Sequence, residues 1–392
     1  MIDVIVAGHL CVDIIPQIPK VSTRSDDFLA PGRLAEVGAA LLSTGGSVSN
    51  TGLALHRLGL DVRLLARIGD DFIANLIRDI LRAHGEGLAD HLSVAHDEPS
   101  SYTIVINPPG VDRSFLHCPG TNNTFGPEDI SPDLLDQARL FHFGYPPLMQ
   151  RMYADGGETL ETLFRQARMR GATTSLDMSM PDAASAGGRA DWRAILRRTL
   201  PHVDLFLPSV EELLYTVWRE RFDELARRAG HDRMIDALTP DDVVALADRT
   251  LALGCRILVI KLGHRGLYLR TADALADLGR GAPADVGMWQ GRELWAPGFR
   301  VDVVGTVGAG DSAIAGFLTG LLRGQGPEDA VTSAAAVGAC NVEAADATSG
   351  VRGWEETLAR VRQGWERLDA RVEGEGWTYR SATGLWHGPR DR

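Results

Sequence analysis

The chain has 392 residues, of which 44% are hydrophobic and 23% are charged, a composition that is ordinary for a globular protein. Its formal net charge of -12 argues against a general nucleic-acid binder, and four scattered cysteines without CxxC spacing predict neither a zinc site nor a disulfide framework. The N-terminus lacks a basic leader and no apolar run has the length that spans a bilayer, so we expect a soluble cytoplasmic protein without membrane partners.

Short apolar runs alternate with amphipathic stretches along most of the chain. The runs that predict strands are residues 4–7, 62–68, 140–143, 174–177, 205–207 and 257–261. Helices are predicted at residues 47–58, 158–170, 192–200 and 241–253, the last with a threonine cap and a proline at its start. This alternation predicts a parallel sheet with helices on both faces.

Several segments depart from that alternation. Residues 12–40 and 99–118 look extended, and the SYTIVIN and RSFLH runs in the second are expected to pair as antiparallel strands. We therefore predict a small β-sheet that stands off the main body as a lid. Residues 218–238, rich in Arg, Asp and Glu, predict a solvated helical insertion. The segment from about residue 374 fits either a partly docked extension or a disordered end.

A first chemical signal is the segment TGGSVSNTGLALHRLGL at residues 44–60. Gly45 and Gly46 form a tight turn at the start of a helix, and Asn50 lies in its first turns. Paired glycines let a ligand hydroxyl approach the main chain, and an Asn amide both donates and accepts. Asp13, just after the first strand, is placed to bind two hydroxyls, and the alternative is an ordinary turn residue. A capped amphipathic helix alone does not explain the Gly-Gly-x-x-x-Asn spacing, so we predict a site for a polyhydroxy ligand.

The strongest signal is VVGTVGAGDSAIAGFLTGLL at residues 303–322. Closely spaced glycines precede Asp311 and a helix, so consecutive amides and the helix dipole converge on one anion site. A carboxylate there is placed to take a proton from an attacking hydroxyl. The alternative is a glycine-rich turn in which Asp311 merely caps the helix. Gly316 and Gly320, four residues apart, predict close packing of this helix against a strand.

Together, and in this order, the two segments resemble the two signature regions of the PfkB/ribokinase family of carbohydrate kinases. Four shorter matches agree with that resemblance: GDD at 69–71, RSFLHCPGTN at 113–122, PSVEE at 208–212 and KLGHRG at 261–266. The resemblance implies a ribokinase-like three-layer α/β/α sandwich with a mainly parallel central sheet and a small β-sheet lid. It assigns residues 1–352 to the kinase domain and leaves 353–392 as a C-terminal helix and tail.

The resemblance also implies an activity, the transfer of the γ-phosphoryl group of ATP to a primary hydroxyl of a small sugar. Asp311 is then the catalytic base, and the amides of Gly308, Ala309 and Gly310 form the anion hole. The residues implied to bind the sugar are Asp13, Gly45, Gly46 and Asn50. The residues implied to bind the nucleotide are Lys261, Gly263, Gly266, Thr306 and Asn341. Glu212 is implied to organise Mg²⁺ through its waters, and the alternative for it is a surface acid at a helix N-terminus.

Three positions depart from the family pattern. Gly305-Thr306-Val307 stands where Asp-Thr-Thr is usual, which leaves activation by a monovalent cation open, and Ser209 replaces the asparagine of the magnesium motif. Ala313 stands where a bulky aromatic residue is common. A nucleoside kinase and a non-catalytic sugar-sensing relative remain alternatives, although the intact Asp311 argues against the second.

Nicotinamide-dependent dehydrogenases and P-loop enzymes are excluded because their sequence motifs are absent. The position of a dinucleotide-binding glycine fingerprint reads Gly8-His9-Leu10-Cys11, and there is no GK[ST] ending of a P-loop. The sequence does not identify the acceptor, whether ribose, a ketohexose, a sugar acid or a nucleoside. The open edge of the predicted lid sheet invites pairing into a homodimer.

Overall fold

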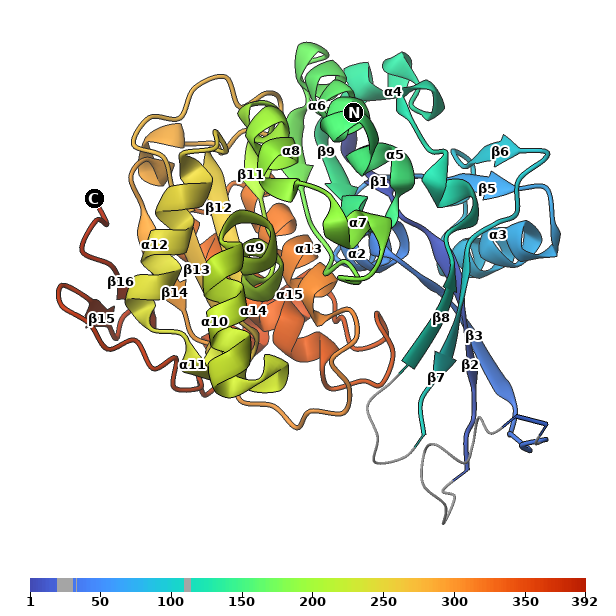
Figure 1. Cartoon of the computed structure of the whole chain (residues 1–392). Helices are drawn as coiled ribbons and strands as arrows, with labels where there is room; N and C mark the ends of the chain where they lie inside the picture. Colours follow the sequence, from blue (N-terminus) through green and yellow to red (C-terminus); the bar gives the residue numbers. More distant parts are fainter. Residues whose placement is uncertain (20–30, 33, 109–113) are drawn as a thin grey trace.

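A ten-stranded central sheet organises the computed structural model of the chain, which describes residues 1–19, 31, 32, 34–108 and 114–392 (Figure 1). Six neighbouring strands run parallel and the remaining four antiparallel, which confirms the predicted mainly parallel sheet. In spatial order the strands are β15 (Thr378–Arg380), β16 (Leu385–His387), β14 (Glu293–Ala296), β13 (Leu267–Thr271), β12 (Ile257–Lys261), β11 (Leu205–Phe206), β10 (Thr173–Leu176), β9 (Ala138–Gly144), β1 (Ile2–Gly8) and β4 (Val62–Leu65).

Helices cover both faces of this sheet, as Figure 1 shows. Alternate residues of β1 belong to two separate cores, Val4 and Val6 to one and Ile5 and Ala7 to the other. The first core contains residues of α2 (Ser47–Arg57), α3 (Phe72–His84), α13 (Ala309–Leu322), α14 (Pro327–Asn341) and α15 (Trp354–Arg362). The second contains residues of α4 (Pro132–Gln137), α5 (Gln150–Tyr153), α6 (Glu158–Met169), α8 (Trp192–Thr199), α9 (Val210–Val217), α10 (Arg219–Ala229), α11 (Met234–Ala237) and α12 (Pro240–Leu251). The three-layer sandwich is therefore confirmed.

The predicted small sheet projects from one side of the body (Figure 1). Its order is β3 (Ala40–Gly45), β2 (Cys11–Pro16), β7 (Tyr102–Ile106) and β8 (Ser114–Cys118). β7 and β8 pair antiparallel as predicted, whereas β2 and β7 run parallel. Arg113 and most of the predicted turn between β7 and β8 lie outside the described residues, as do residues 20–30 and 33 of the first lid segment.

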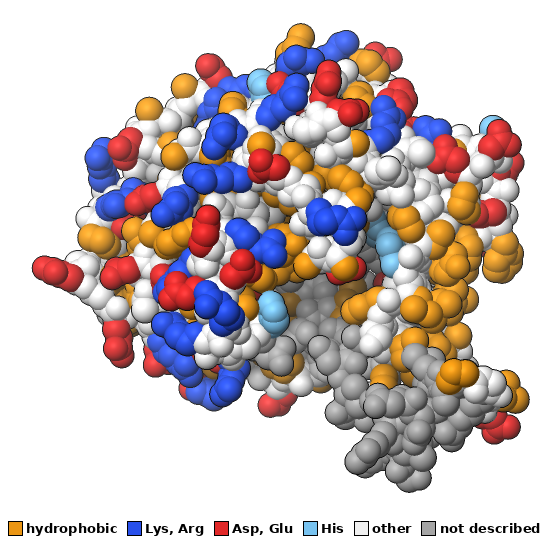
Figure 2. Space-filling view, viewed as in Figure 1, with side chains coloured by type: hydrophobic (Ala, Val, Ile, Leu, Met, Phe, Trp, Pro, Cys, Tyr) orange, Lys and Arg blue, Asp and Glu red, His pale blue; other side chains and the backbone are white. Residues whose placement is uncertain are grey.

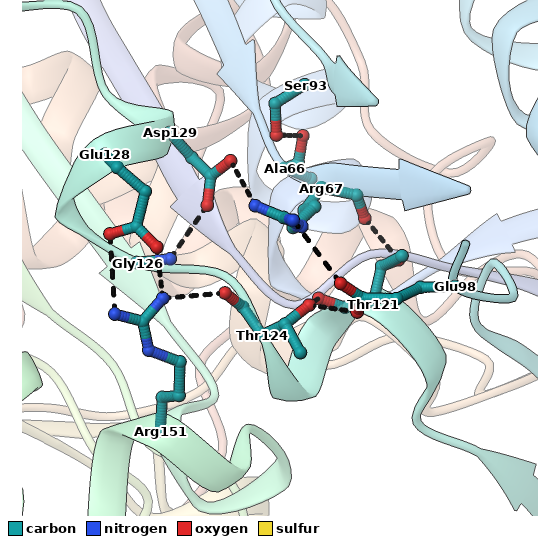
Figure 3. A network of polar contacts seen from close by, with 10 residues as sticks. All are labelled: Ala66, Arg67, Ser93, Glu98, Thr121, Thr124, Gly126, Glu128, Asp129 and Arg151. Carbon is teal, nitrogen blue, oxygen red and sulfur yellow. Dashed lines mark hydrogen bonds and ion pairs between the residues drawn. The ribbon is translucent and has the colours of Figure 1, made fainter. Parts of the chain in front are cut away.

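The apolar run at residues 62–68 is not one strand, which corrects the prediction. It breaks at Ala66, and β5 (Arg67–Gly69) pairs instead with β6 (Ser93–Ala95) in a separate two-stranded sheet. Arg67 lies at the centre of a polar network, with its guanidinium 3.1 Å from Asp129 and 3.3 Å from Glu98 (Figure 3). The strand turns away because a charged side chain with two buried or half-buried carboxylate partners does not fit an apolar sheet face.

The same network fixes the segment that returns from the lid to the body. The Thr121 hydroxyl donates to the carbonyl of Arg67 at 2.6 Å, and Arg151 contacts Glu128 (Figure 3). Next to it, the Asn122 amide donates to the carbonyl of Leu10 at 3.0 Å and accepts from the N–H of Leu10 at 3.1 Å. The chain leaving β1 and the chain leaving β8 are thus tied together where lid meets body.

The C-terminal segment is docked, which decides between the two alternatives that the sequence left open. β16 pairs with β14 and extends the central sheet by two strands. Beyond it, Asp391 is 2.7 Å from the Arg292 guanidinium and 2.5 Å from Nδ1 of His387, and both carboxylate partners are nearly buried. Buried charges held in this way fix the segment to one place on the sheet.

The insertion at residues 218–238 is only partly solvated, contrary to the prediction. Phe222, Leu225 and Met234 of α10 and α11 are buried against the second core, while Arg219, Arg227, Arg228 and Arg233 are exposed. Among the described residues, no helix has the length and apolar character needed to cross a membrane.

Candidate active site

The glycine-rich segment ends in a tight turn at the start of α13. Gly308 precedes the helix with φ of 70°, and a Cβ at this position would lie 2.2 Å from the carbonyl oxygen of Ala347. Only glycine fits there. The N–H of Ala309 donates to the carbonyl of Thr306 at 3.3 Å, whereas the described part of the chain supplies no acceptor for the N–H groups of Gly308 and Gly310. These two amides are therefore available to an anion.

Asp311 lies in the first turn of α13 and is 4% exposed. Its carboxylate accepts hydrogen bonds from the Tyr145 hydroxyl at 2.8 Å, from Asn50 Nδ2 at 3.2 Å and from the Thr51 hydroxyl at 3.1 Å. Burial raises the pKa of Asp311 above its ordinary value, while Lys261 and the three donors oppose the rise. Gly308 occupies the N-cap position, so the alternative that Asp311 merely caps the helix is wrong.

The two signature segments meet at this carboxylate, although Asn50 and Asp311 are 261 residues apart in the chain. The amide nitrogen of Asn50 donates a hydrogen bond to Asp311. The amide oxygen of Asn50 is buried and has no hydrogen-bond partner among the described residues. Asn50 is thus placed to hold the acid on one side and to accept a hydrogen bond from a ligand on the other.

Gly45 and Gly46 make room for two side chains that follow β1. A Cβ on Gly45 would lie 2.2 Å from Oδ2 of Asp13, and a Cβ on Gly46 would lie 2.4 Å from the carbonyl oxygen and 2.6 Å from Nδ1 of His9. Gly46 also has φ of 90°. Asp13 accepts a hydrogen bond from the Cys11 thiol at 3.4 Å, and burial raises its pKa. The Gly-Gly pair therefore shapes one wall of a polar cradle.

A buried charge cluster lies beside Asp311. The Lys261 ammonium contacts Asp177 at 2.7 Å, with side-chain exposures of 12% and 1%. Burial alone lowers the pKa of Lys261, but the carboxylates of Asp177 and Glu212 outweigh it, so the pKa is raised and the ammonium keeps its charge. Burial raises the pKa of Asp177, and Lys261 opposes that rise.

Glu212 and Ser209 form a reciprocal cap at the start of α9. The Glu212 carboxylate accepts from the N–H of Ser209 at 2.7 Å, and the Ser209 hydroxyl accepts from the N–H of Glu212 at 3.3 Å. Glu212 nevertheless faces the hollow that contains the charge cluster, whose lining includes Tyr145, Asp177, Glu211, Glu212, Lys261, Gly308, Gly310 and Asp311. Among the described residues no three acidic, His or Cys side chains cluster as metal ligands. A Mg²⁺ ion here would rely mostly on water and phosphate oxygens, as this ion usually does.

A second, more apolar cavity of about 350 Å³ opens on the other side of Lys261 and Gly310. Four of the residues implied to bind nucleotide line it, namely Lys261, Gly263, Gly266 and Thr306, together with Phe299, Val301, Val303, Ala313, Val342 and Leu368. Asn341 does not line it: the residue is fully buried, and its amide donates to the carbonyl of Val307 at 2.8 Å. Asn341 therefore supports the glycine-rich loop from behind the cavity wall.

Several residues of this site were missed from the sequence. They are His9, Thr51, His117, Tyr145 and Asp177. Position carried a signal for three of them, because His9, Tyr145 and Asp177 each directly follow a parallel strand, β1, β9 or β10. The carboxyl ends of parallel strands share one edge of the sheet, where ligands bind in open α/β folds.

Comparisons with known proteins show similarity to carbohydrate kinases over nearly the whole chain. A family model described as pfkB family carbohydrate kinase matches residues 1–352. A 2-dehydro-3-deoxygluconokinase of Thermoproteus tenax is 27% identical over 350 residues, which cover 87% of this chain and 90% of that protein. A fructokinase of Rhizobium leguminosarum bv. trifolii is 26% identical over 309 residues, 79% of this chain and 77% of that protein. The structure of Arabidopsis thaliana ribokinase complexed with ribose and ATP matches with a TM-score of 0.67 at 18% identity and covers 92% of this chain and 98% of that one.

Proposed function

Because the chain belongs to the pfkB family of carbohydrate kinases, we propose that it transfers the γ-phosphoryl group of ATP to a primary hydroxyl of a sugar, with Asp311 as the general base. The observation that supports this most is the burial of one carboxylate where the two glycine-rich segments meet. The carboxylate lies at the same end of α13 as the N–H groups of Gly308 and Gly310, for which the described residues supply no acceptor.

In this mechanism Asp311 removes the proton from the attacking hydroxyl. Tyr145, Asn50 and Thr51 hold both carboxylate oxygens in place, so the acid needs no reorganisation when the acceptor arrives. Its raised pKa makes it a stronger base than an exposed aspartate. Direct transfer requires no phosphorylated enzyme.

The negative charge of the transferred group is met by the chain's own donors. The N–H groups of Gly308 and Gly310 face it at the positive end of α13, and the Lys261 ammonium lies at the junction of the two cavities. When bound, Mg²⁺ supplies further positive charge at the phosphates, and Asp177, with one buried oxygen lacking a partner among the described residues, and Glu212 fit its hydration shell.

The two ends of the cleft suit different partners. The apolar cavity bounded by Phe299 and Leu368 suits the adenosine half of the nucleotide, and the cradle of Asp13, Gly45 and Gly46 suits the sugar. The lid sheet is positioned to cover the sugar and exclude water, which would otherwise accept the phosphoryl group.

A coupled assay of ADP release tests the activity. We expect turnover with at least one member of a panel of pentoses, hexoses, sugar acids and nucleosides, in the presence of ATP and Mg²⁺. A nucleoside preferred over every free sugar would favour the nucleoside-kinase alternative. Ligand binding without ADP release across the panel would contradict the proposal and favour a sensor.

We also propose that two copies pair through their lids. β3 and β8 are the outer strands of the lid sheet, and Leu41, Leu42, Phe115 and Leu116 on them are exposed. Hydrophobic side chains gather over this part of the molecule in Figure 2. Open edges and apolar side chains of this kind favour strand pairing or face-to-face packing. Sedimentation velocity at micromolar concentration should give a dimer that Leu116→Glu dissociates, and a monomeric wild type would contradict the pairing.

A further inference from the structure

One wall of the apolar cavity comes from a segment that the family model does not cover. The match to that model ends at residue 352, whereas Leu368 lines the cavity together with Phe299. Leu368 belongs to residues 365–371, which follow α15 and are called the wall segment below. The cavity is therefore completed by a part of the chain that lies outside the region shared with the family.

The wall segment is joined to the cavity rim through its backbone. The N–H of Leu368 donates to the carbonyl of Gly298, and the N–H of Arg300 donates to the carbonyl of Glu366, both at 2.8 Å. These reciprocal bonds form an antiparallel bridge between the wall segment and the loop that follows β14. Leu368 is thus held at a fixed position beside the cavity.

Two side chains of the wall segment hold the Phe299 ring. The indole of Trp365 stacks on it with a centroid distance of 4.5 Å and an interplanar angle of 26°, and the Arg367 guanidinium carbon lies 4.4 Å from the ring centroid. Phe299 itself is 3% exposed. Its ring therefore owes its orientation at the cavity to residues that follow the family region.

Arg367 also links the wall segment to α14. Its guanidinium donates to the carbonyl of Pro297 at 3.1 Å and to the hydroxyl of Thr332 on α14 at 3.3 Å. Burial lowers the pKa of Arg367 to about 10, so the side chain keeps its charge and all its donors at neutral pH. Because Ala335 and Ala339 of α14 line the same cavity, Arg367 connects two of its walls.

A second buried arginine ties the wall segment to the loop implied to bind the nucleotide. Arg265 lies between Gly263 and Gly266, which both line the cavity, and it is 1% exposed. Its guanidinium donates to the carbonyl of Ala370 at 3.0 Å and to that of Arg371 at 3.2 Å. The wall segment is therefore fixed to the cavity at both of its ends.

The wall segment lies at the adenosine end of the cleft. Phe299 and Leu368 present apolar atoms there, which suit the flat faces of a purine base. None of the described residues that line the hollow beside Asp311 belongs to the wall segment. A contact made only with the base is equally strong before and during phosphoryl transfer, so it changes the affinity for the nucleotide and leaves the chemical step unchanged.

We propose that the wall segment is part of the nucleotide site, in which Leu368 contacts the base while Trp365 and Arg367 position Phe299 beside it. The affinity of this chain for ATP then depends on residues outside the region that it shares with the family. The inference rests on the proposed kinase function and adds to it a determinant of nucleotide affinity.

The test combines isothermal titration of ATP and Mg²⁺ into the full chain with steady-state kinetics on the acceptor that gives the fastest ADP release. Leu368→Ala removes most of an apolar side chain from the cavity wall. The Kd and KM for ATP should therefore rise by about 5- to 30-fold, with kcat within about twofold of wild type. Leu368→Trp keeps an apolar side chain but fills space that the base needs, and it should raise the Kd by at least about tenfold.

Two controls separate the cavity wall from the rest of the wall segment. Leu368→Met preserves the side-chain volume, and Glu366→Ala shortens an exposed side chain whose ion-pair partner is the exposed Arg300. Both should keep the Kd for ATP within about twofold of wild type. If Leu368→Ala and Leu368→Trp both bound ATP as tightly as wild type, or if kcat fell as strongly as KM rose, the inference would be overturned.

The binding measurement also distinguishes this inference from the kinase proposal. The expected order of Kd values without ADP release from any acceptor would remove the kinase proposal and leave the role of the wall segment standing. Turnover by the wild type with a Kd for ATP that neither Leu368→Ala nor Leu368→Trp alters would do the reverse. A wild type that binds no ATP would overturn both.

Discussion

Replacement of Asp311 by asparagine is expected to lower kcat by about 10²–10⁴, with little change in affinity for ATP or the acceptor. The amide keeps the size of the carboxylate but cannot take the proton. Wild-type activity should fall as the pH drops through the pKa of Asp311, which lies above that of an ordinary aspartate, and this limb should disappear in the variant. Steady-state kinetics across pH provides the measurement.

The variant should remain folded. A carboxyl group whose folded pKa is raised costs stability above that pKa, so removing its charge does not weaken the fold at neutral pH. The Thr51 hydroxyl can turn to accept from the new amide instead of donating to it. Asp302→Asn, at an exposed acid directly before the glycine-rich segment, is the matched control. Equal turnover by Asp311→Asn and wild type would remove the proposed base.

Lys261→Met is expected to lower kcat by about 10²–10³ and to destabilise the fold by about 3–5 kcal/mol. Among the described residues, Lys261 is the cation that lines the hollow beside Asp311, and without it Asp177 is left buried with no positive partner there. Kinetics at saturating ATP and thermal unfolding of the free protein measure the two losses separately.

The double variant Lys261→Met with Asp177→Asn separates stability from catalysis. It removes both charges, so most of the lost stability should return, because a neutral pair leaves no unpaired buried ion. Activity should stay low, because the cation is still missing. If activity returned together with stability, Lys261 would have a purely structural role.

The helices and strands that the sequence predicted correctly carry local signals. α12 begins at Pro240 behind a Thr239 cap whose partner Asp242 lies three residues on, all visible in the sequence. The break between β4 and β5 was not predictable from local signals. Arg67 is held by the carboxylates of Glu98 and Asp129, which come 31 and 62 residues later in the chain. An apolar run gives no sign of such distant partners.

The helix glycines show a second limit. Gly316 and Gly320 were expected to pack against a strand, but a Cβ on them would approach Val337 and Ala330 of α14 at 2.9 and 3.3 Å. Four-residue spacing indicates a close neighbour without saying whether it is a helix or a strand.

In the site, motif matching found the glycines and Asp311 but not Tyr145, which contacts Asp311 although the two are 166 residues apart in the chain. Contacts of that kind are set by tertiary packing.

The docking of β16 beside β14 has a consequence for biosynthesis. Residues 378–391 leave the ribosome after every other described element, yet they cover one edge of the central sheet. Until they emerge, the nascent chain exposes the backbone groups of β14 to strands of neighbouring nascent chains. Co-translational misassembly should therefore concentrate in the interval between the emergence of β14 and that of β16.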